Sequence, residues 1–193
     1  MADALIPLIV FVSLMVGTPG PANLLIMTGG ATYGVRACMP FNLGLICGKI
    51  ALNVAVGLGL GVLITRYPLL QTALKFISGG YMIWLAMQSW NSVAEVEAAR
   101  SAYSFRKGLI VHPLNPKAWV MTLLAWSDFA PAFGDLPTQM LVIVTCFAVA
   151  QAIFHTGWCI AGGLLGHAFH GSLILSRTLI VITVTVVVGV LLS

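Results

Sequence analysis

The sequence predicts an all-α membrane protein in which six transmembrane helices form one domain. Hydrophobic residues make up 60% of the 193 residues and charged residues only 7%, and the mean hydropathy is +1.03. Soluble globular proteins are far more polar than this. No polar stretch is long enough to form a second domain, so residues 1–193 are expected to form a single transmembrane domain.

The first span is predicted to be broken in its middle. No charged residue occurs between Asp3 and Arg36, and this interval is too long for a secretory signal peptide. As one helix it would extend over about 48 Å, whereas the hydrocarbon core is about 30 Å thick. Pro19 and Pro21 each remove a backbone donor and clash with the preceding turn, so we expect two half-helices that meet near these prolines.

Further apolar stretches follow, each close to the roughly 20 residues that cross a bilayer. They are residues 41–65, 68–90, 108–129, 136–166 and 173–192. The fourth span contains Asn115 and Pro116 and is therefore expected to be broken like the first. The last has only a short apolar stretch after Arg177, whose side chain can reach back to the lipid headgroups.

The spans fall into two halves around a polar loop at about residues 91–107. Because each half crosses the bilayer three times, equivalent segments must run in opposite directions. This predicts two inverted three-helix repeats, at about residues 1–90 and 108–193, and the first span of each carries a proline and asparagine break. Lipid cannot pair the backbone groups that a break frees, so such breaks face other protein or a watery cavity, as in transporters.

The distribution of Lys and Arg predicts the orientation of the chain in the membrane. The odd-numbered loops hold Arg36, Arg100, Arg106, Lys107 and Arg177, whereas the even-numbered loops hold Arg66. We therefore expect the odd-numbered loops in the cytoplasm and both termini outside, and the acidic Asp128 and Asp135 on the far side agree with this. The basic residues between 100 and 107 are too sparse to predict a nucleic-acid partner.

Several short motifs follow one another along nearly the whole chain. They are Thr18-Pro19-Gly20-Pro21-Ala22-Asn23, then Gly79-Gly80-Tyr81 with Trp84-Leu85, then Phe105-Arg106-Lys107-Gly108 followed by Asn115-Pro116-Lys117. In these motifs the chain resembles the LysE/RhtB family of amino-acid exporters. The resemblance implies a six-helix exporter in the bacterial inner membrane that moves small amino acids or their derivatives and is driven by the proton gradient.

The two breaks offer the groups that an amino-acid cargo requires. Amides at the start of a half-helix, or a cation, can bind a carboxylate, while carbonyl or side-chain oxygens can bind an ammonium. The amides of residues 22–24 open the second half of the first span, and the carbonyls before its two prolines lack amide partners. The expected cargo-binding residues are Pro19, Gly20, Pro21, Asn23, Lys49, Asn115, Pro116 and Lys117.

Lysines embedded in apolar sequence are candidate functional groups because an ionisable residue is unfavourable at membrane depth. Lys117 directly follows the second break and is expected to be either a carboxylate partner or a helix-end contact. Lys49 lies near the middle of its span, where it either serves the transport cycle or reaches toward the headgroups. For Lys75, nearer a span end, a headgroup contact is the favoured interpretation.

No Asp or Glu lies clearly inside a predicted span, so the candidate residues for proton coupling are His155 and Asp128. Deprotonation of a desolvated lysine is a further route. Histidine titrates near neutral pH, and His155 shares one face of the fifth span with Gln151 and Trp158. A neutral, hydrogen-bonded histidine within the bundle is the alternative. Asp128 lies at the outer end of the fourth span, where an interfacial carboxylate is equally expected. His112 is either a wall of the site or a headgroup contact.

Other classes of function have less support in the sequence. Glycine pairs such as Gly44 and Gly48 favour close packing within the bundle, and they leave a homodimer open. A metal-cation exporter, the alternative function, would require embedded carboxylate, thiolate or imidazole clusters, and no metal site is predicted. No serine has an assignable general base and the cysteines are widely spaced, so neither an enzyme nor a cofactor is expected.

Overall fold

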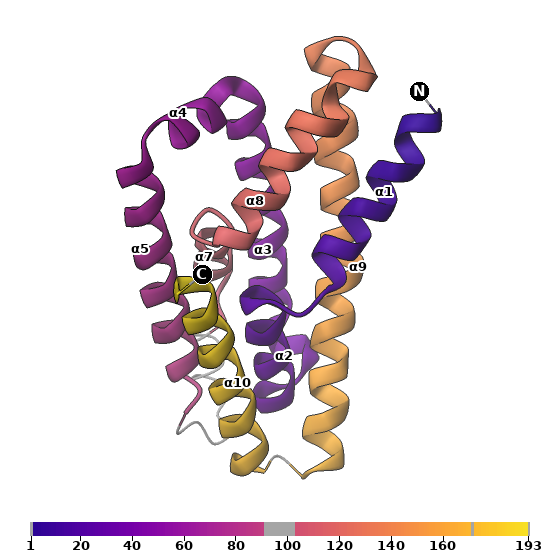
Figure 1. Cartoon of the computed structure of the whole chain (residues 1–193). Coiled ribbons are helices and arrows are strands. Elements are labelled where there is room, and N and C mark those ends of the chain that lie inside the picture. The colour runs from indigo at the N-terminus through magenta and orange to yellow at the C-terminus, as the bar shows by residue number, and fades with distance from the viewer. Residues whose placement is uncertain (1, 91–102, 171, 193) are drawn as a thin grey trace.

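The computed structural model describes residues 2–90, 103–170 and 172–192, and every regular element in these ranges is a helix (Figure 1). The predicted all-α class is therefore confirmed for this part of the chain. Most of the predicted loop at 91–107, including Arg100, lies outside the described residues.

The predicted break in the first span is confirmed. Helix α1 spans Ala2–Gly17 and α2 spans Pro21–Tyr33, and the two are bent by 55°. Gly20 has an extended backbone, and Pro21 stands at the first helical position of α2, where the missing proline N–H would have no partner in any case.

The second span begins earlier than predicted, because α3 starts at Val35 rather than at residue 41. Gly34 separates α2 from α3 with a φ of +82°, a conformation that glycine adopts without a steric penalty. Arg36 therefore lies in the first turn of α3 and not in a loop. Helix α3 ends at Ala55 and continues through a π-helical turn, Val56–Leu60.

The second and third spans are joined at one end of the bundle. The π-helical turn contains a kink at Gly59, with a φ of +104°, and leads into α4, Gly61–Arg66. Helix α5 then spans Pro68–Met87, close to the predicted third span.

The predicted break in the fourth span is also confirmed. Helix α7 spans Phe105–Val111 and α8 spans Pro116–Leu124. Because α7 begins before residue 108, Arg106 and Lys107 belong to its first turn. Helix α8 continues into a π-helical turn, Ala125–Phe129, and a 3-10 turn, Ala130–Phe133.

The last two helices are α9, Leu136–Ala168, and α10, Leu173–Leu192. By length and composition, α3 with its π-helical turn, α9 and α10 can each cross a membrane, and the bent α1–α2 pair can form a fourth span. Neither α5 nor the α7–α8 pair is in this set. The apolar sequence of α5 is interrupted by Gln71 and Lys75, and α7 and α8 are each short. The described helices thus support three or four of the six predicted spans.

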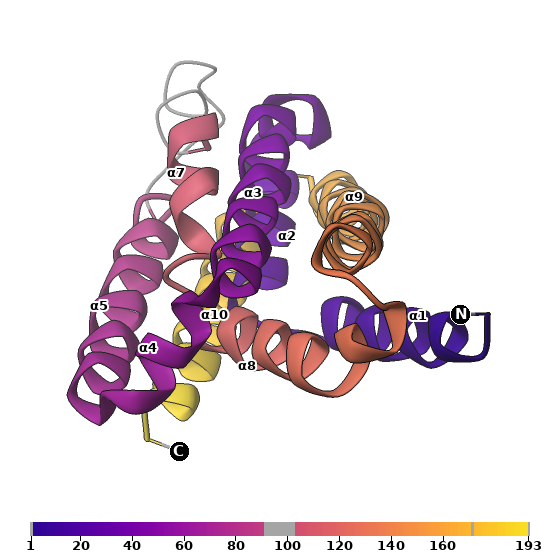
Figure 2. The ribbon, with the colours of Figure 1, turned by 90° about the horizontal axis from the view of Figure 1, so that it is seen from above.

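Two long helices organise the bundle. In Figure 1, α3 and α9 run along the length of the molecule, with α2 at the lower end and α1 and α8 slanting across the upper half. Figure 2 looks almost along the axis of α9 and shows α1 and α8 lying across the view. The most extensive helix contacts are those of α2 with α9 and of α7 with α3, so one half-helix from each break packs against a long helix of the other half.

Glycines permit these two contacts. A Cβ atom at Gly162 or Gly166 would collide with a backbone carbonyl of α2, and one at Gly44 or Gly48 would collide with a carbonyl of α7. The expectation that these glycine pairs pack within the bundle is therefore confirmed. Gly34 differs, since a Cβ there would meet no atom within 4 Å, and its role is in the turn.

Replacing Gly162 with alanine should destabilise the bundle. The added methyl group would collide with the Met27 carbonyl, and overpacking of this kind typically reduces stability by about 1–3 kcal/mol. Gly157 is the matched control on the same helix, because a Cβ there would meet nothing within 4 Å. Thermal unfolding in detergent should show a lower melting temperature for Gly162→Ala than for Gly157→Ala; equal values would contradict the proposed close contact.

Candidate functional site

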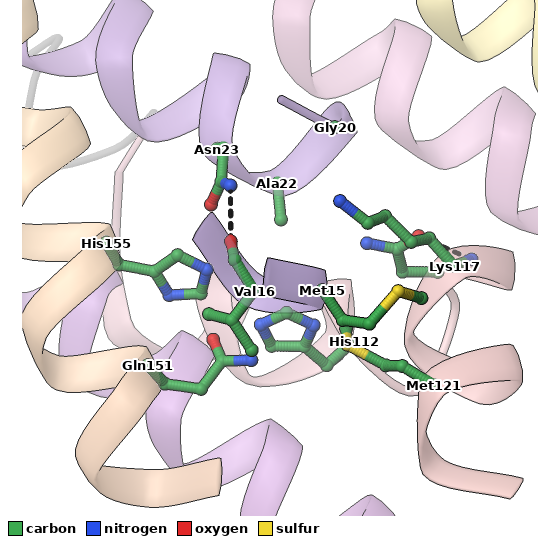
Figure 3. A pocket seen from close by; sticks show the side chains of 11 residues that line it. Met15, Val16, Gly20, Ala22, Asn23, His112, Lys117, Met121, Gln151 and His155 are labelled. Carbon is green, nitrogen blue, oxygen red and sulfur yellow. Dashed lines mark hydrogen bonds between the residues drawn. The ribbon is translucent and has the colours of Figure 1, made fainter. Parts of the chain in front are cut away.

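A small cavity lies where the two helix breaks meet. Its walls come from the end of α1, the start of α2, the α7–α8 break and the middle of α9 (Figure 3). Its volume is about 10 Å³, which is room for about one water molecule. The lining residues are Met15, Val16, Gly20, Ala22, Asn23, His112, Asn115, Lys117, Met121, Gln151 and His155.

The cavity is a polar layer between two hydrophobic clusters. One face of α9 shows this directly, because the residues spaced four apart along it change from apolar to polar and back to apolar. Phe147 belongs to one hydrophobic cluster, together with Leu8 and Ile143, whereas Cys159 belongs to the other. Between them, Gln151 and His155 are buried and face the cavity.

Asn23 closes the break in the first span. Its side-chain amide donates to the Val16 carbonyl at 2.8 Å and to the Thr18 carbonyl at 2.9 Å, which are among the carbonyls freed where α1 ends. Its Oδ1 atom is buried and has no hydrogen-bond partner among the described residues. At the start of α2 the Leu24 amide bonds to the Gly20 carbonyl, so the amides of Ala22 and Asn23 precede the helical hydrogen-bond ladder.

Lys117 joins the two breaks. Its Nζ donates to the Thr18 carbonyl at 3.0 Å and to the Thr18 hydroxyl at 2.9 Å, and a cation at the carbonyl end of a helix is electrostatically favourable. A Cβ on Gly20 would lie 3.1 Å from Lys117 Cδ and 3.2 Å from its Nζ. Lys117 therefore makes a helix-end contact, one of the two roles expected from the sequence.

Each break is also closed by a tryptophan. The indole N–H of Trp158 donates to the Gly17 carbonyl at 3.1 Å, and that of Trp119 donates to the Pro113 carbonyl at 2.8 Å. Asn115 caps α8, because its side-chain oxygen accepts from the Lys117 amide at 3.1 Å.

Two histidines stack against each other beside these breaks. The ring centroids of His112 and His155 are 5.3 Å apart and the planes differ by 11°, and each residue is 1% exposed. In Figure 3 the Gln151 amide points toward the His112 ring. Within the described chain, both nitrogens of His112, both amide atoms of Gln151 and Nδ1 of His155 lack a hydrogen-bond partner.

Lys49 lies outside the cavity lining, although it is fully buried, with 0% exposure. Its Nζ donates to the Ala118 carbonyl at 3.1 Å and to the Thr122 hydroxyl at 2.5 Å, and it lies 4.1 Å from the centroid of the Phe147 ring. Its charge thus links α3 to α8 and α9 instead of reaching the headgroups.

The structure gathers part of the predicted site. The predicted residues that line the cavity are Gly20, Asn23, Asn115, Lys117 and His155. Those that do not line it are Pro19, Pro21, Lys49, Pro116 and Asp128. The prolines shape the two breaks from outside the lining. Asp128 is exposed in the π-helical turn after α8, where it accepts from the Ser127 hydroxyl at 2.6 Å.

Two polar residues of the cavity, His112 and Gln151, were not among the predicted binding or proton-coupling residues, although a wall of the site was one of the two interpretations given for His112. The signal for both was present in the sequence, because His112 stands three residues before Asn115 and Gln151 stands one helical turn before His155. In residues 2–90, 103–170 and 172–192 no group of three or more His, Cys, Asp or Glu side chains could hold a metal ion.

Comparison with known proteins identifies the family. The chain is 27% identical to an uncharacterised membrane protein of Vibrio cholerae, over 82% of this chain and 80% of that protein. It is 26% identical to a homoserine/homoserine lactone efflux protein of Salmonella typhimurium, over 73% of this chain and 71% of the relative. It is 25% identical to a threonine efflux protein of Escherichia coli, over 69% of this chain and 77% of that protein. No solved structure matches the chain.

The family model of the LysE type translocators matches residues 12–193 and so includes both helix breaks and every residue that lines the cavity. This family consists of efflux transporters and not of enzymes. The resemblance found in the motifs is thereby confirmed: the chain belongs to the LysE type translocator family.

Proposed function

We propose that this protein exports small amino acids or their derivatives across the bacterial inner membrane by proton antiport and alternating access. Membership of a translocator family supports the transport function, and the names of the homoserine/homoserine lactone and threonine efflux relatives support an amino-acid cargo. The proposed arrangement has six spans in two inverted repeats, about residues 1–90 and 108–193, with both termini outside.

The observation that carries the proposal is the set of unpaired polar atoms at the cavity. Asn23, His112, Gln151 and His155 contribute six buried side-chain atoms that have no hydrogen-bond partner among the described residues. Buried polar groups are nearly always paired, and a cluster of exceptions calls for a polar occupant. Because amide and imidazole groups can both donate and accept, they suit a zwitterion, which brings both an ammonium and a carboxylate.

Each end of an amino acid has candidate partners in this arrangement. A carboxylate can accept from Lys117 and from the amides of Ala22 and Asn23, which precede the helical ladder of α2. An ammonium can donate to Asn23 Oδ1 and Gln151 Oε1, neither of which is otherwise bonded in the described residues. An uncharged derivative such as a lactone could use the same amides and oxygens.

The size of the cavity supports alternating access. A cavity with room for about one water molecule is too small for an amino acid, so the proposed cycle includes a second conformation in which the cavity is wider. In the proposed cycle the half-helices α1 and α8 move against the long helices and open the cavity. Lys117, which bonds across the two breaks to Thr18, is the contact that such a movement must break.

We assign proton coupling to the stacked His112 and His155. Two imidazoles at this separation cannot both become charged without repulsion, and Lys49 and Lys117 add further positive charge close to His155. The pair is therefore suited to carrying one proton at a time. Asp128, the other candidate from the sequence, is exposed and away from the cavity lining.

The test of the proposed function is efflux from proteoliposomes preloaded with a mixture of amino acids, with and without an imposed pH gradient. Loss of particular amino acids that depends on the gradient is the expected result. Absence of efflux under both conditions, from correctly inserted protein, would overturn the proposal. The metal-cation alternative would then be tested by the same assay with divalent cations, although no ligand cluster in the described residues favours it.

Replacing His155 with glutamine should separate transport from proton coupling. Glutamine keeps hydrogen-bonding capacity but cannot carry a proton. Gradient-driven efflux should fall by about tenfold or more, equivalent to 1.4 kcal/mol or more, whereas exchange of cargo at equal pH should persist. His167, an exposed histidine of α9 away from the cavity lining, is the matched control. Equal loss of both activities in His155→Gln would indicate a structural role instead.

A further inference from the structure

A second, larger cavity adjoins the small one. It lies between α5, α8 and the end of α10, which are neighbours in Figures 1 and 2, and its volume is about 610 Å³. Ligand pockets in proteins typically measure about 300–1,000 Å³. Met15 and Lys117 line both cavities, so the two spaces adjoin at these side chains.

The α5 wall of this cavity carries polar side chains. Gln71, Lys75 and Ser78 line it, and their spacings of four and three place them on one face of the helix. Ser78 is buried and Lys75 is half-buried. The Ser78 hydroxyl is already paired, because it donates to the Leu74 carbonyl within the helix, so Lys75 is the charged group of this wall.

The remaining walls determine what the occupant can be. Leu74, Trp119, Leu123 and Val190 supply a large apolar surface. Lys75 and Lys117 supply positive charge, and the described lining contains no Asp or Glu. Two of the three donors of the Lys117 ammonium bond to Thr18, which leaves the third for an anion.

We propose that the larger cavity receives the side chain of the cargo, and that the preferred cargo is an amino acid with an uncharged, apolar side chain. Its carboxylate binds Lys117 at the boundary between the cavities, and its side chain packs against Trp119 and Leu123. A cationic side chain is disfavoured by Lys75. This inference rests on the proposed export function and adds the class of cargo to it.

A lipid chain is a less suitable occupant of the same space. An acyl chain carries no group that could bind Lys117 where the two cavities adjoin. It would also not account for the adjoining cavity, whose polar atoms are unpaired among the described residues. Lipid is accordingly treated as the competing outcome in the experiment.

The experiment compares two tryptophan substitutions on α8. Val120→Trp fills the larger cavity, because Val120 lines it, whereas Leu124→Trp adds the same bulk at a residue that does not. Both positions are exposed, at 52% and 39%, so both variants should fold, and thermal unfolding in detergent checks this. Each protein is placed in proteoliposomes loaded with equal concentrations of alanine, leucine, phenylalanine and lysine.

We expect wild-type protein to export leucine and phenylalanine in preference to lysine. Val120→Trp should lower leucine and phenylalanine efflux by about tenfold or more, the scale of a filled apolar pocket, while alanine efflux and all efflux by Leu124→Trp stay near wild type. Identical cargo profiles for the two variants would overturn the inference, as would a preference for lysine or the loss of a co-purified phospholipid without a change in cargo selectivity. If wild-type protein exports no amino acid, the proposed function itself fails.

Discussion

Asn23→Ala should nearly abolish transport while the protein still inserts and folds. The substitution removes both hydrogen bonds to the carbonyls at the end of α1 and the unpaired Oδ1 atom at the cavity. Each buried polar group left without a partner is worth about 1–3 kcal/mol, which corresponds to about a 5- to 150-fold effect on binding. Efflux from proteoliposomes, normalised to inserted protein, measures the loss.

Asn42→Ala is the matched control for this experiment. Asn42 and Asn23 are both 4% exposed, and the Asn42 side-chain amide donates to the Thr156 hydroxyl at 2.9 Å, away from the cavity. Both substitutions should lower thermal stability, but Asn23→Ala alone should stop efflux. Undiminished export by Asn23→Ala would exclude Asn23 from the cargo site.

Lys49→Met should stop transport without destabilising the fold. The buried ammonium is held by a carbonyl, a hydroxyl and an aromatic ring, and none of these carries a full negative charge. Replacing a buried charge by an apolar side chain of similar size is often neutral or stabilising. The Ala118 carbonyl also stays paired, because the Thr122 hydroxyl donates to it at 2.6 Å.

Lys107→Met provides the control for the Lys49 prediction. Lys107 also donates to a side-chain oxygen, that of Gln88, and lies 5.1 Å from the centroid of the Trp84 ring, but it is only half-buried near the start of α7, whereas Lys49 is fully buried. Transport that is lost in Lys49→Met and kept in Lys107→Met, at equal or higher melting temperature, is the expected pattern. Normal efflux by Lys49→Met would mean that its charge has no part in the cycle.

The two helix breaks illustrate what sequence can predict. Proline removes a helical hydrogen bond, and the breaks before α2 and α8 occur where prolines stand close together beside glycine or asparagine. A single proline is not enough, because Pro7 and Pro40 lie inside α1 and α3. The start of α3 at Val35 was harder to predict, because it depends on the positive φ of Gly34. Glycine permits that conformation without requiring it.

The site was predicted in part for a related reason. Asn23 and Asn115 lie at the breaks and so reach the cavity that the breaks create. The position of Lys49 could not be predicted from its depth in the span. The rotation of α3 about its own axis directs the side chain to Ala118 and Thr122 of α8, away from the cavity, and this rotation is set by packing against the rest of the bundle.

Hydropathy and proline act through neighbouring residues, so the membrane character of the chain, its helical class, its two broken helices and its family resemblance could be predicted without a structure. Which distant groups meet could be learned only from the folded chain. Lys117 bonds to Thr18 across 99 positions of sequence, His112 of the α7–α8 break stacks on His155 of α9, and Lys117 stands between two cavities of very different size. These contacts depend on how whole helices pack and rotate against one another, which no local pattern of residues specifies.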